Sequence, residues 1–367
     1  MKVELIDLRE RFKEEGNIII KIVKKVLSKG NLILTKEVKN FESLICKYTG
    51  AKYCLGLNSG TDALMMSLWS SGIKKGDEVI TSPVSFVATA NSIMHVGAKP
   101  VFVDIGDDLN INPDLIESAI TKNTKAIMPV HWTGRICKMD KIIKIANKYN
   151  LKIIEDAAQA TGAYYKDKHA GTFGSISAFS THPLKNLNAL GDGGFIITNE
   201  KKLYEKIKLY RSHGLEGRDD AKIVGVNSRL DSIHAEVLSF RLKKLRNIIS
   251  RRKKNISYYK KYVKTDKIKI LKDDKRERNA YVMFVALAEK RDELQKYLKK
   301  FNIQSLLYYP TPLHLHNSLK CLGYKKGDLI NAEKITSKVI SFPHHQHLSE
   351  KQIKFVSEKI NKFYSYK

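Results

Sequence analysis

The chain has 367 residues, 43% of them hydrophobic and 28% charged, which excludes a disordered protein and allows a large core and two domains. Its first residues lack the apolar stretch of a signal peptide, and no uncharged apolar run is long enough to span a membrane, so we expect a cytoplasmic protein without membrane contact. The cysteines lie far apart without the paired spacing of a metal site, which favours free thiols: Cys46, Cys54, Cys137 and Cys321.

The formal net charge of +28 is extreme and on its own permits nucleic-acid binding. The lysines are spread along the chain, however. The densest basic run, Arg246 to Lys261, also carries apolar residues at helical spacing: Ile248, Ile249, Ile256 and Tyr259. This pattern indicates an amphipathic helix with a solvated basic face. We therefore expect no nucleic-acid partner, although a basic surface favours an anionic small substrate.

Two helices are expected near the amino terminus, over Arg9–Leu27 and Thr35–Tyr48. From Ala51 onward, short apolar runs alternate with helix-like spans. The seven expected strands are Tyr53–Leu57, Glu78–Thr81, Pro100–Ile105, Ala126–Trp132, Lys152–Asp156, Ile176–Ser180 and Phe195–Thr198. The expected helices are Asp62–Ser71, Val87–Val96, Pro113–Ile120, Met139–Tyr149 and Lys201–Tyr210. This alternation predicts an α/β domain over residues 1–243, with a mainly parallel seven-stranded sheet between helices.

The remaining residues, 244–367, are expected to form a smaller α+β domain that begins around the basic helix near Arg246. Its expected strands are Ile268–Leu271 and Tyr281–Ala288, and its expected helices are Arg291–Lys300 and Glu350–Phe363. The segment Phe342–His347 contains three histidines and could be read as a metal site. Because it offers no carboxylate and no further ligand at usable spacing, we favour a surface loop and expect no metal.

Three polar segments follow expected strands, at the ends where parallel sheets bind ligands. Asn58 to Leu64 turns on small residues and starts a helix, so it is either a phosphate site or an ordinary helix cap. It is neither a Walker loop nor a three-glycine dinucleotide motif. The next strand ends on Glu155 and Asp156, which either cap a helix or face a cation. Lys185 lies in a loop before Gly191–Gly194, where a lysine can form an imine.

In their order and spacing, these segments resemble the DegT/StrS family of sugar aminotransferases, pyridoxal-phosphate enzymes of the aspartate-aminotransferase fold. The resemblance extends from the region of Asn31 to Phe342. The matching segments are Asn58–Leu64, Gly76–Ile80, Phe86–Ala90, Gly97–Asp104, Glu155–Gln159, Lys185–Asn186, Gly191–Gly194, Asn227–Asp231 and Tyr309–Pro310. The resemblance implies a large domain that binds pyridoxal 5'-phosphate and a smaller C-terminal domain.

The resemblance also implies a role for each matching residue. Lys185 matches the Schiff-base lysine, which moves a proton between cofactor and substrate carbons, and Asp156 matches the partner of the pyridine nitrogen. The other cofactor residues are Gln159 beside the ring oxygen, Phe86 stacked on the ring, Gly60, Thr61 and Ser180 around the phosphate, and Asn227 reaching the phosphate in the other subunit. A buried phenylalanine at position 86 would need no ligand. The match at Asn227 implies a homodimer with shared active sites.

The candidate substrate residues are His182, Asn188, Tyr308, Tyr309 and His314. The first two flank Lys185, and the resemblance places the others near the sugar, although a loop stiffened by Pro310 and Pro312 explains the same segment. The chain departs from the family pattern at four places: Tyr308 replaces histidine, Asn188 replaces glycine, Val226 replaces tyrosine, and Trp132 to Arg135 replaces Leu-Tyr-Gly-Gln. These changes cluster where the acceptor is expected and predict an unusual keto substrate.

Together these features predict a dimeric transaminase that moves an amino group from L-glutamate, or glutamine, to a nucleotide-linked keto-sugar. The product would serve amino-sugar and surface-glycan biosynthesis, such as lipopolysaccharide or O-antigen. The Pro-x-Lys-Asn form around Lys185 resembles branches that aminate a 3-keto hexose, and a lysine instead of histidine there favours transamination over dehydration. The alternative acceptors are a keto-inositol, a keto-octulosonate or a precursor of an aromatic amine. A non-catalytic relative that binds nucleic acid is the alternative from another class.

Overall fold

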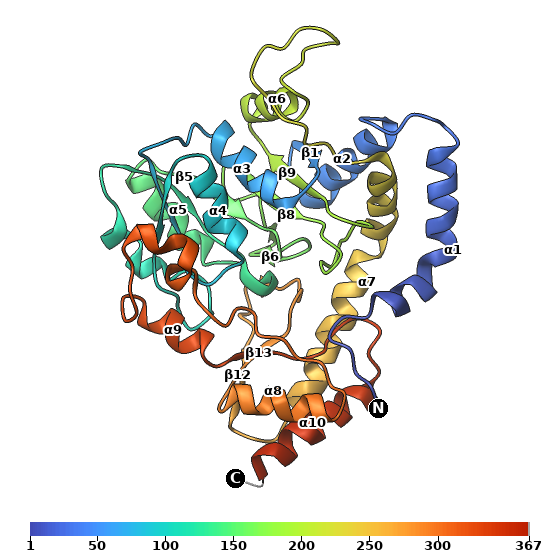
Figure 1. The fold of residues 1–367 in the computed structure, drawn as a ribbon, viewed down its shortest axis with the longest axis vertical. Coiled ribbons are helices and arrows are strands. Elements are labelled where there is room, and N and C mark those ends of the chain that lie inside the picture. Colours follow the sequence, from blue (N-terminus) through green and yellow to red (C-terminus); the bar gives the residue numbers. More distant parts are fainter. Residues whose placement is uncertain (366–367) are drawn as a thin grey trace.

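The computed structural model describes residues 1–365, which form a large part built on a seven-stranded sheet and a smaller C-terminal part below it (Figure 1). The sheet has the order β1-β9-β8-β5-β4-β2-β3. Its strands are β1 Tyr53–Leu57, β2 Glu78–Thr81, β3 Lys99–Phe102, β4 Thr124–Met128, β5 Lys152–Asp156, β8 Ile176–Ser180 and β9 Gly194–Thr198. All are parallel except β9, which is antiparallel to both of its neighbours. The predicted α/β class and its mainly parallel sheet are confirmed.

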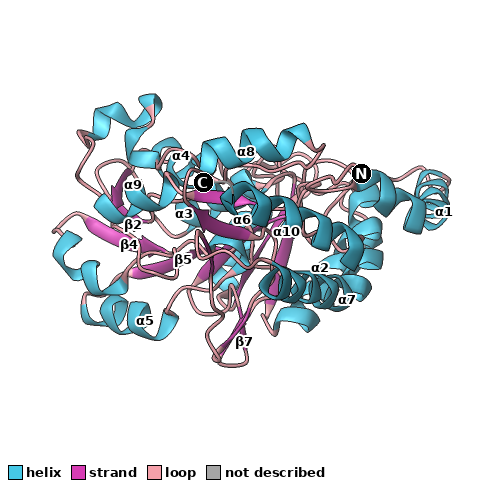
Figure 2. Ribbon diagram, turned by 90° about the horizontal axis from the view of Figure 1, so that it is seen from below, coloured by secondary structure: helices cyan, strands magenta, loops and turns pink. Residues whose placement is uncertain are grey.

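Helices cover both faces of this sheet (Figure 2). On one face, α3 Gly60–Ser70, α4 Val87–His95 and α6 Lys201–Tyr210 share a core with the strands. On the other face, α2 Lys36–Thr49, α5 Met139–Lys148 and α7 Ser232–Tyr262 contribute Phe41, Ile142 and Leu238 to a second core. Because both faces are covered, every residue of β8 and β9 is buried, as expected for central strands of an α/β sheet.

The C-terminal part packs α8 Arg291–Lys300 and α10 Glu350–Ser365 around a second antiparallel sheet of β10 Ile268–Ile270, β12 Val285–Ala288 and β13 Val339–Ser341. A third sheet, of β11 Glu277–Arg278, β6 Tyr164–Tyr165 and β7 Lys168–His169, connects the two parts. The remaining helices are α1 Leu8–Leu27, which lies beside α7, and α9 Ile330–Thr336. The division at residue 243 stays a prediction, since α7 belongs to both parts. None of the helices within residues 1–365 is long and apolar enough to cross a membrane.

Two predicted helices differ from the structure. The helix expected over residues 113–120 is wrong: the segment forms two short 3-10 turns, Pro113–Leu115 and Glu117–Ala119. Only Pro113 and Ile116 are buried there, which is too narrow an apolar face to hold an α-helix on the sheet. The helix expected to begin near Arg246 begins at Ser232, because its apolar stripe continues toward the amino terminus through Leu238, Leu242 and Leu245.

Two predictions for the C-terminal part are also wrong. The strand expected from Tyr281 begins only at Val285, because the amides of Ala280 and Val282 donate to the carbonyls of Gly134 and Thr133 instead. The expected surface loop at Phe342–His347 is largely buried, with His344 2% and His345 4% exposed. Its backbone carbonyls accept hydrogen bonds from Asn255 of α7, so the loop is a packing element. No group of metal-binding residues is found within the described chain.

Candidate active site

Polar segments meet at one edge of the large sheet, where its parallel strands end. Leu57, Asp156 and Ser180 are the last residues of β1, β5 and β8. Gly194, the first residue of the antiparallel β9, pairs with both Leu57 and Ser180, while Asp156 pairs with Ala178 of β8. The topology therefore brings the three predicted segments together at the edge where α/β sheets bind ligands.

The start of α3 forms an anion site beside β8. The Oγ atom of Ser59 caps this helix by accepting a hydrogen bond from the Asp62 amide at 3.0 Å. A Cβ atom on Gly60 would lie 2.7 Å from the Ser180 Cβ, so only glycine lets the helix approach this strand so closely. The first amides of α3, from Gly60 and Thr61, have no carbonyl partner within the helix. Together with the Ser180 hydroxyl they suit a phosphate group.

Asp156 is buried and faces this edge. Its carboxylate accepts hydrogen bonds from the Thr89 hydroxyl at 2.7 Å and from the Ala158 amide at 3.2 Å. Burial raises the pKa of Asp156 above its ordinary value, and these two hydrogen bonds and the charge of Lys185 oppose that shift. The alternative that Asp156 only caps a local turn explains its hydrogen bond from the Ala158 amide but not the one from Thr89. The position of Lys185 shows that Asp156 also faces a cation.

Lys185 is half-buried in the loop between β8 and β9. Its backbone amide donates to the His182 carbonyl at 2.8 Å, which fixes the turn. Within residues 1–365, its Nζ atom makes no hydrogen bond. Burial lowers the pKa of Lys185 to about 8, and the nearby charge of Asp156 opposes the shift. An amine that loses its proton near neutral pH is a competent nucleophile and proton carrier.

Phe86, Gln159 and Tyr309 lie around the same site. Phe86 caps α4 and is 55% exposed, which excludes the alternative of a core phenylalanine. Its ring centroid lies 6.1 Å from that of Tyr309. Burial raises the pKa of Tyr309, and a hydrogen bond to Gln159 opposes this shift. The Oε1 atom of Gln159 accepts a hydrogen bond from the Thr133 amide at 2.7 Å, so the amide group is held in one orientation.

These features fit one cofactor. An exposed aromatic face, a buried carboxylate, an unbonded lysine and a glycine-lined anion site suit the ring, pyridine nitrogen, aldehyde and phosphate of pyridoxal 5'-phosphate. The fold and the site thus define a pyridoxal-phosphate-dependent transferase.

The chain belongs to the DegT/DnrJ/EryC1/StrS aminotransferase family, whose model matches residues 13–361, and it is a pyridoxal-phosphate-dependent transaminase. It is 40% identical to the pleiotropic regulatory protein of Geobacillus stearothermophilus, over 99% of both chains. It is 38% identical to dTDP-3-amino-3,6-dideoxy-alpha-D-galactopyranose transaminase of Aneurinibacillus thermoaerophilus, over 98% of this chain and 99% of that protein. The crystal structure of Streptomyces venezuelae DesV in complex with a ketimine intermediate matches with a TM-score of 0.96 and 33% identity, over 99% and 98% of the two chains.

Two of the predicted substrate residues, Asn188 and His314, bond to other residues of the protein. Asn188 is buried; its Nδ2 donates to the Pro183 carbonyl at 2.6 Å and its Oδ1 accepts from Arg241 at 3.2 Å. His314 is 1% exposed, and its Nε2 lies 3.1 Å from a carboxylate oxygen of Glu333. We therefore expect Asn188 to hold the Lys185 loop and His314 to hold α9.

The other predicted residues are more accessible. His182 is half-buried, with its Nδ1 accepting from the Leu184 amide at 3.2 Å. Tyr308 is half-buried beside Tyr309, with 5.7 Å between the ring centroids. Asn227 is exposed at the base of the loop after α6, where it forms an antiparallel bridge with Ser212. The structure thus groups Tyr308 and Tyr309 with Phe86, and leaves Asn227 exposed at the base of the loop after α6.

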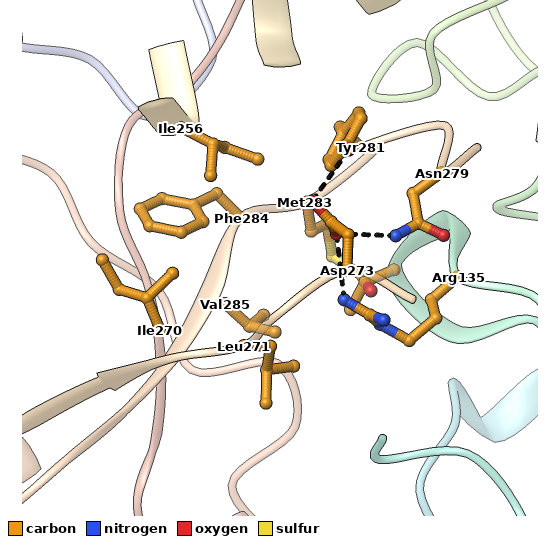
Figure 3. Close-up of a pocket in the computed structure, with 11 residues that line it drawn as sticks. Arg135, Ile256, Ile270, Leu271, Asp273, Asn279, Tyr281, Met283, Phe284 and Val285 are labelled. Carbon is orange, nitrogen blue, oxygen red and sulfur yellow. Dashed lines mark hydrogen bonds and ion pairs between the residues drawn. The ribbon is translucent and has the colours of Figure 1, made fainter. Parts of the chain in front are cut away.

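Two side chains of the departure at Trp132 to Arg135 are held within the protein. Trp132 is buried, and the Arg135 guanidinium pairs with Asp273 at 3.2 Å and Glu277 at 3.0 Å. A role of this segment at the acceptor stays a prediction. Figure 3 shows Arg135 turned toward Asp273, which also accepts hydrogen bonds from Asn279 and Tyr281. The adjoining cavity, of about 30 Å³, is too small for a sugar.

One site residue, Thr89, was missed by the sequence analysis. Its hydroxyl lies between Ser85, at 2.6 Å, and the Asp156 carboxylate. The signal was present, because Thr89 belongs to the family-like segment Phe86–Ala90. A threonine on the first turn of a helix has no visible partner in a sequence, however, and its contact with Asp156 spans 67 positions.

Proposed function

We propose that this transaminase moves the amino group of L-glutamate to a nucleotide-linked 3-keto sugar, in amino-sugar biosynthesis for a surface glycan. The observation that carries the proposal is the convergence of Lys185, Asp156 and the Gly60 turn at one sheet edge, with Phe86 exposed beside them. The acceptor class and the 3-position draw support from the A. thermoaerophilus relative, a transaminase named for a dTDP-linked 3-amino sugar, and from the Pro-x-Lys-Asn form around Lys185.

Each residue of the site has its own proposed role, which follows from its surroundings. Gly60, Thr61 and Ser180 would bind the cofactor phosphate, Phe86 would cover one face of its ring, and Gln159 would lie at the ring oxygen. Asp156, held by Thr89, keeps the ring nitrogen protonated. The bound cofactor supplies an electron sink for the bonds of the amino-bearing carbon. Lys185 would hold the cofactor, and its neutral amine would move a proton between the amino-bearing carbon of the substrate and a carbon of the cofactor.

We further propose that two copies of the chain share their active sites. In the loop after α6, which projects from the top of the molecule in Figure 1, Val224 is 94% exposed, and Asn227 is exposed at the base of the loop. On α1, Phe12 is 58% exposed. Such outward apolar residues favour burial against a second copy, which would place Asn227 at the partner's cofactor phosphate. Analytical ultracentrifugation tests this arrangement, and mixing of Lys185→Ala and Asn227→Ala subunits should restore one active site per mixed dimer.

The function is tested by spectroscopy followed by an acceptor screen. The purified protein should carry a visible absorption band of bound pyridoxal phosphate, and L-glutamate should shift it. The loaded protein is then offered dTDP- and UDP-linked sugars with a keto group at carbon three or four, together with a keto-inositol, and products are measured by mass. Amination of only the inositol, or no response to L-glutamate, contradicts the substrate proposal while leaving the transaminase chemistry intact.

A further inference from the structure

A second polar pocket lies behind the Lys185 loop, between α1, α7 and the segment that follows β13. Its volume is about 100 Å³, and it lies apart from the exposed ring of Phe86. The residues that line it are Arg11, Glu14, Glu15, Lys244, Asn247, Ile248, Arg251, Gln346 and His347. The pocket takes no part in the chemistry proposed above.

The wall of this pocket buries more positive charge than it neutralises. Arg11, Arg241 and Arg252 are 5%, 6% and 2% exposed, and Glu15 is the carboxylate buried with them. Glu15 Oε1 accepts from Arg11 Nε at 3.2 Å and from Arg241 Nε at 2.7 Å. Arg252 is bonded only to neutral groups, the Gln346 side chain and the carbonyls of Tyr281 and Val282. Buried cations that lack counter-charges destabilise a fold.

The pKa values of these arginines reflect the imbalance. Burial and the neighbouring charge of Arg241 lower the pKa of Arg11 to about 10, although Glu15 and Glu14 oppose the shift. Burial and the charge of Arg11 lower the pKa of Arg252 to about 9. Both groups are still cations at neutral pH, so the cluster would gain free energy from an added anion.

The geometry supplies a donor for such an anion. Arg11 Nη2 is buried and has no hydrogen-bond partner within the described residues, and Arg11 lines the cavity. Lys244 and Arg251 flank the same cavity and pair with the exposed carboxylate of Glu14, at 3.9 and 3.6 Å. His347 Nδ1 lies 3.4 Å from that carboxylate as well. In and behind the wall of the pocket there are thus five cationic side chains and two carboxylates. The cations are Arg11, Lys244, Arg251 and, behind the wall, Arg241 and Arg252, and the carboxylates are Glu14 and Glu15.

We propose that this pocket binds a small oxyanion, of the phosphate class, through the free Nη2 donor of Arg11 and the charges of Lys244 and Arg251. A cavity of about 100 Å³ has room for one phosphate group. It shares no lining residue with the site at Lys185, Asp156 and Phe86. Arg11 and Arg241 connect it to the reactive loop, since Arg241 Nη1 donates to the carbonyls of Asn188 at 2.6 Å and Ala189 at 3.0 Å.

Calorimetric titration of the cofactor-loaded protein with inorganic phosphate tests the proposal, because the loaded cofactor occupies the anion site at α3. We expect one phosphate per chain. Arg11→Gln should weaken binding about tenfold or more, the value of a charge-assisted hydrogen bond. Glu15 stays paired with Arg241 in this variant. Glu14→Gln removes a competing charge and should tighten binding up to about fivefold.

Arg9→Gln is the matched control, since it removes the same charge from α1 at a side chain that is 75% exposed. The proposal is overturned if phosphate does not saturate one site, or if Arg9→Gln and Arg11→Gln weaken binding equally. If Arg11→Gln does not fold, the double variant Lys244→Gln with Arg251→Gln is titrated instead. We expect this double variant to lose phosphate binding as well. Competition by acetate would show that carboxylates share the site, and its absence would restrict the site to phosphate and its esters.

Discussion

Glu155 and Asp156 are neighbours on β5, yet their surroundings differ. Glu155 is completely buried and accepts hydrogen bonds from the amides of Gly171, Phe173 and Gly174, each at 2.7 Å. His131 Nε2 adds a fourth contact at 2.9 Å; it carries the proton, because His131 Nδ1 accepts from the Cys137 amide at 3.3 Å. Asp156, on the other side of the strand, has only the donors from Thr89 and Ala158.

The difference separates a structural carboxylate from a reactive one. Four donors satisfy Glu155 fully, so it fixes the loop at Gly171–Gly174 and needs no ligand. Asp156 keeps free acceptor capacity, a raised pKa and Lys185 as its neighbour. A buried carboxylate with unused acceptor sites at the ligand-binding edge of a sheet is ready to meet a group that the chain does not supply.

The largest effect is expected at the reactive side of this comparison. Lys185→Ala should lower transamination by at least about 10³-fold, because the variant loses both the nucleophile and the proton carrier. Turnover is measured as keto acid released from L-glutamate. Lys201→Ala, which removes an exposed lysine at the start of α6, should retain full turnover. Equal activity of the two variants would remove Lys185 from the mechanism.

Asp156→Asn tests the carboxylate itself. The neutral amide cannot keep the ring nitrogen protonated, so turnover should fall about 10²-fold or more. Stability should not fall, since the substitution replaces a costly buried charge with a group of the same shape. Denaturant unfolding of the cofactor-free variant checks the second point. A large loss of stability together with intact turnover would make Asp156 another structural carboxylate.

Glu155→Gln should give the opposite pattern. The amide loses charge-assisted hydrogen bonds to three backbone amides, and its own NH₂ group faces one of those donors, so the free energy of unfolding should drop by about 2–4 kcal/mol. The folded Glu155→Gln variant should still bind the cofactor. Stability is measured by urea unfolding and occupancy by the visible absorption band. Loss of cofactor from a protein of unchanged stability would contradict the assignment.

The sequence was most informative where apolar runs are short and covered on both faces. The expected strands 53–57, 78–81, 152–156 and 176–180 match β1, β2, β5 and β8 residue for residue. Their carboxyl ends, and the family resemblance, then predicted the region of the site. The local pattern predicts such strands because burial on both faces favours short apolar runs, with the few buried polar residues, such as Glu155 and Asp156, near the strand ends.

What the sequence could not predict are partners that lie far apart along the chain. Arg135 is paired with Glu277, which is 142 positions away and belongs to β11 of the sheet that connects the two parts. The His344 side chain was expected at the surface, but it is covered by the carbonyl of Tyr281 at 2.9 Å. Polar residues of this kind are buried only when a distant donor or acceptor satisfies them, and such a pairing leaves no local periodicity.

The smallest expected effect is the pH dependence of cofactor uptake, which also distinguishes Asp156 from Glu155. Since burial lowers the pKa of Lys185 to about 8, its amine is protonated below that pH and neutral above it. Cofactor uptake by the cofactor-free protein should therefore rise about tenfold between pH 7 and pH 9 and then level off. The unfolded chain keeps this proton up to its ordinary pKa of 10.5, so Lys185 also makes stability rise with pH between about 8 and 10.5.

The variant Asp156→Asn tests whether Asp156 sets this pH dependence. The charge of Asp156 raises the pKa of Lys185 against the effect of burial, so its removal should move the midpoint of uptake below pH 8. Glu155→Gln lies on the other side of β5, with its carboxylate enclosed by backbone amides, and should leave the midpoint unchanged. The rate at which the visible band appears after mixing measures both midpoints. If both variants shifted it equally, the two carboxylates would not differ in the way that their hydrogen bonds indicate.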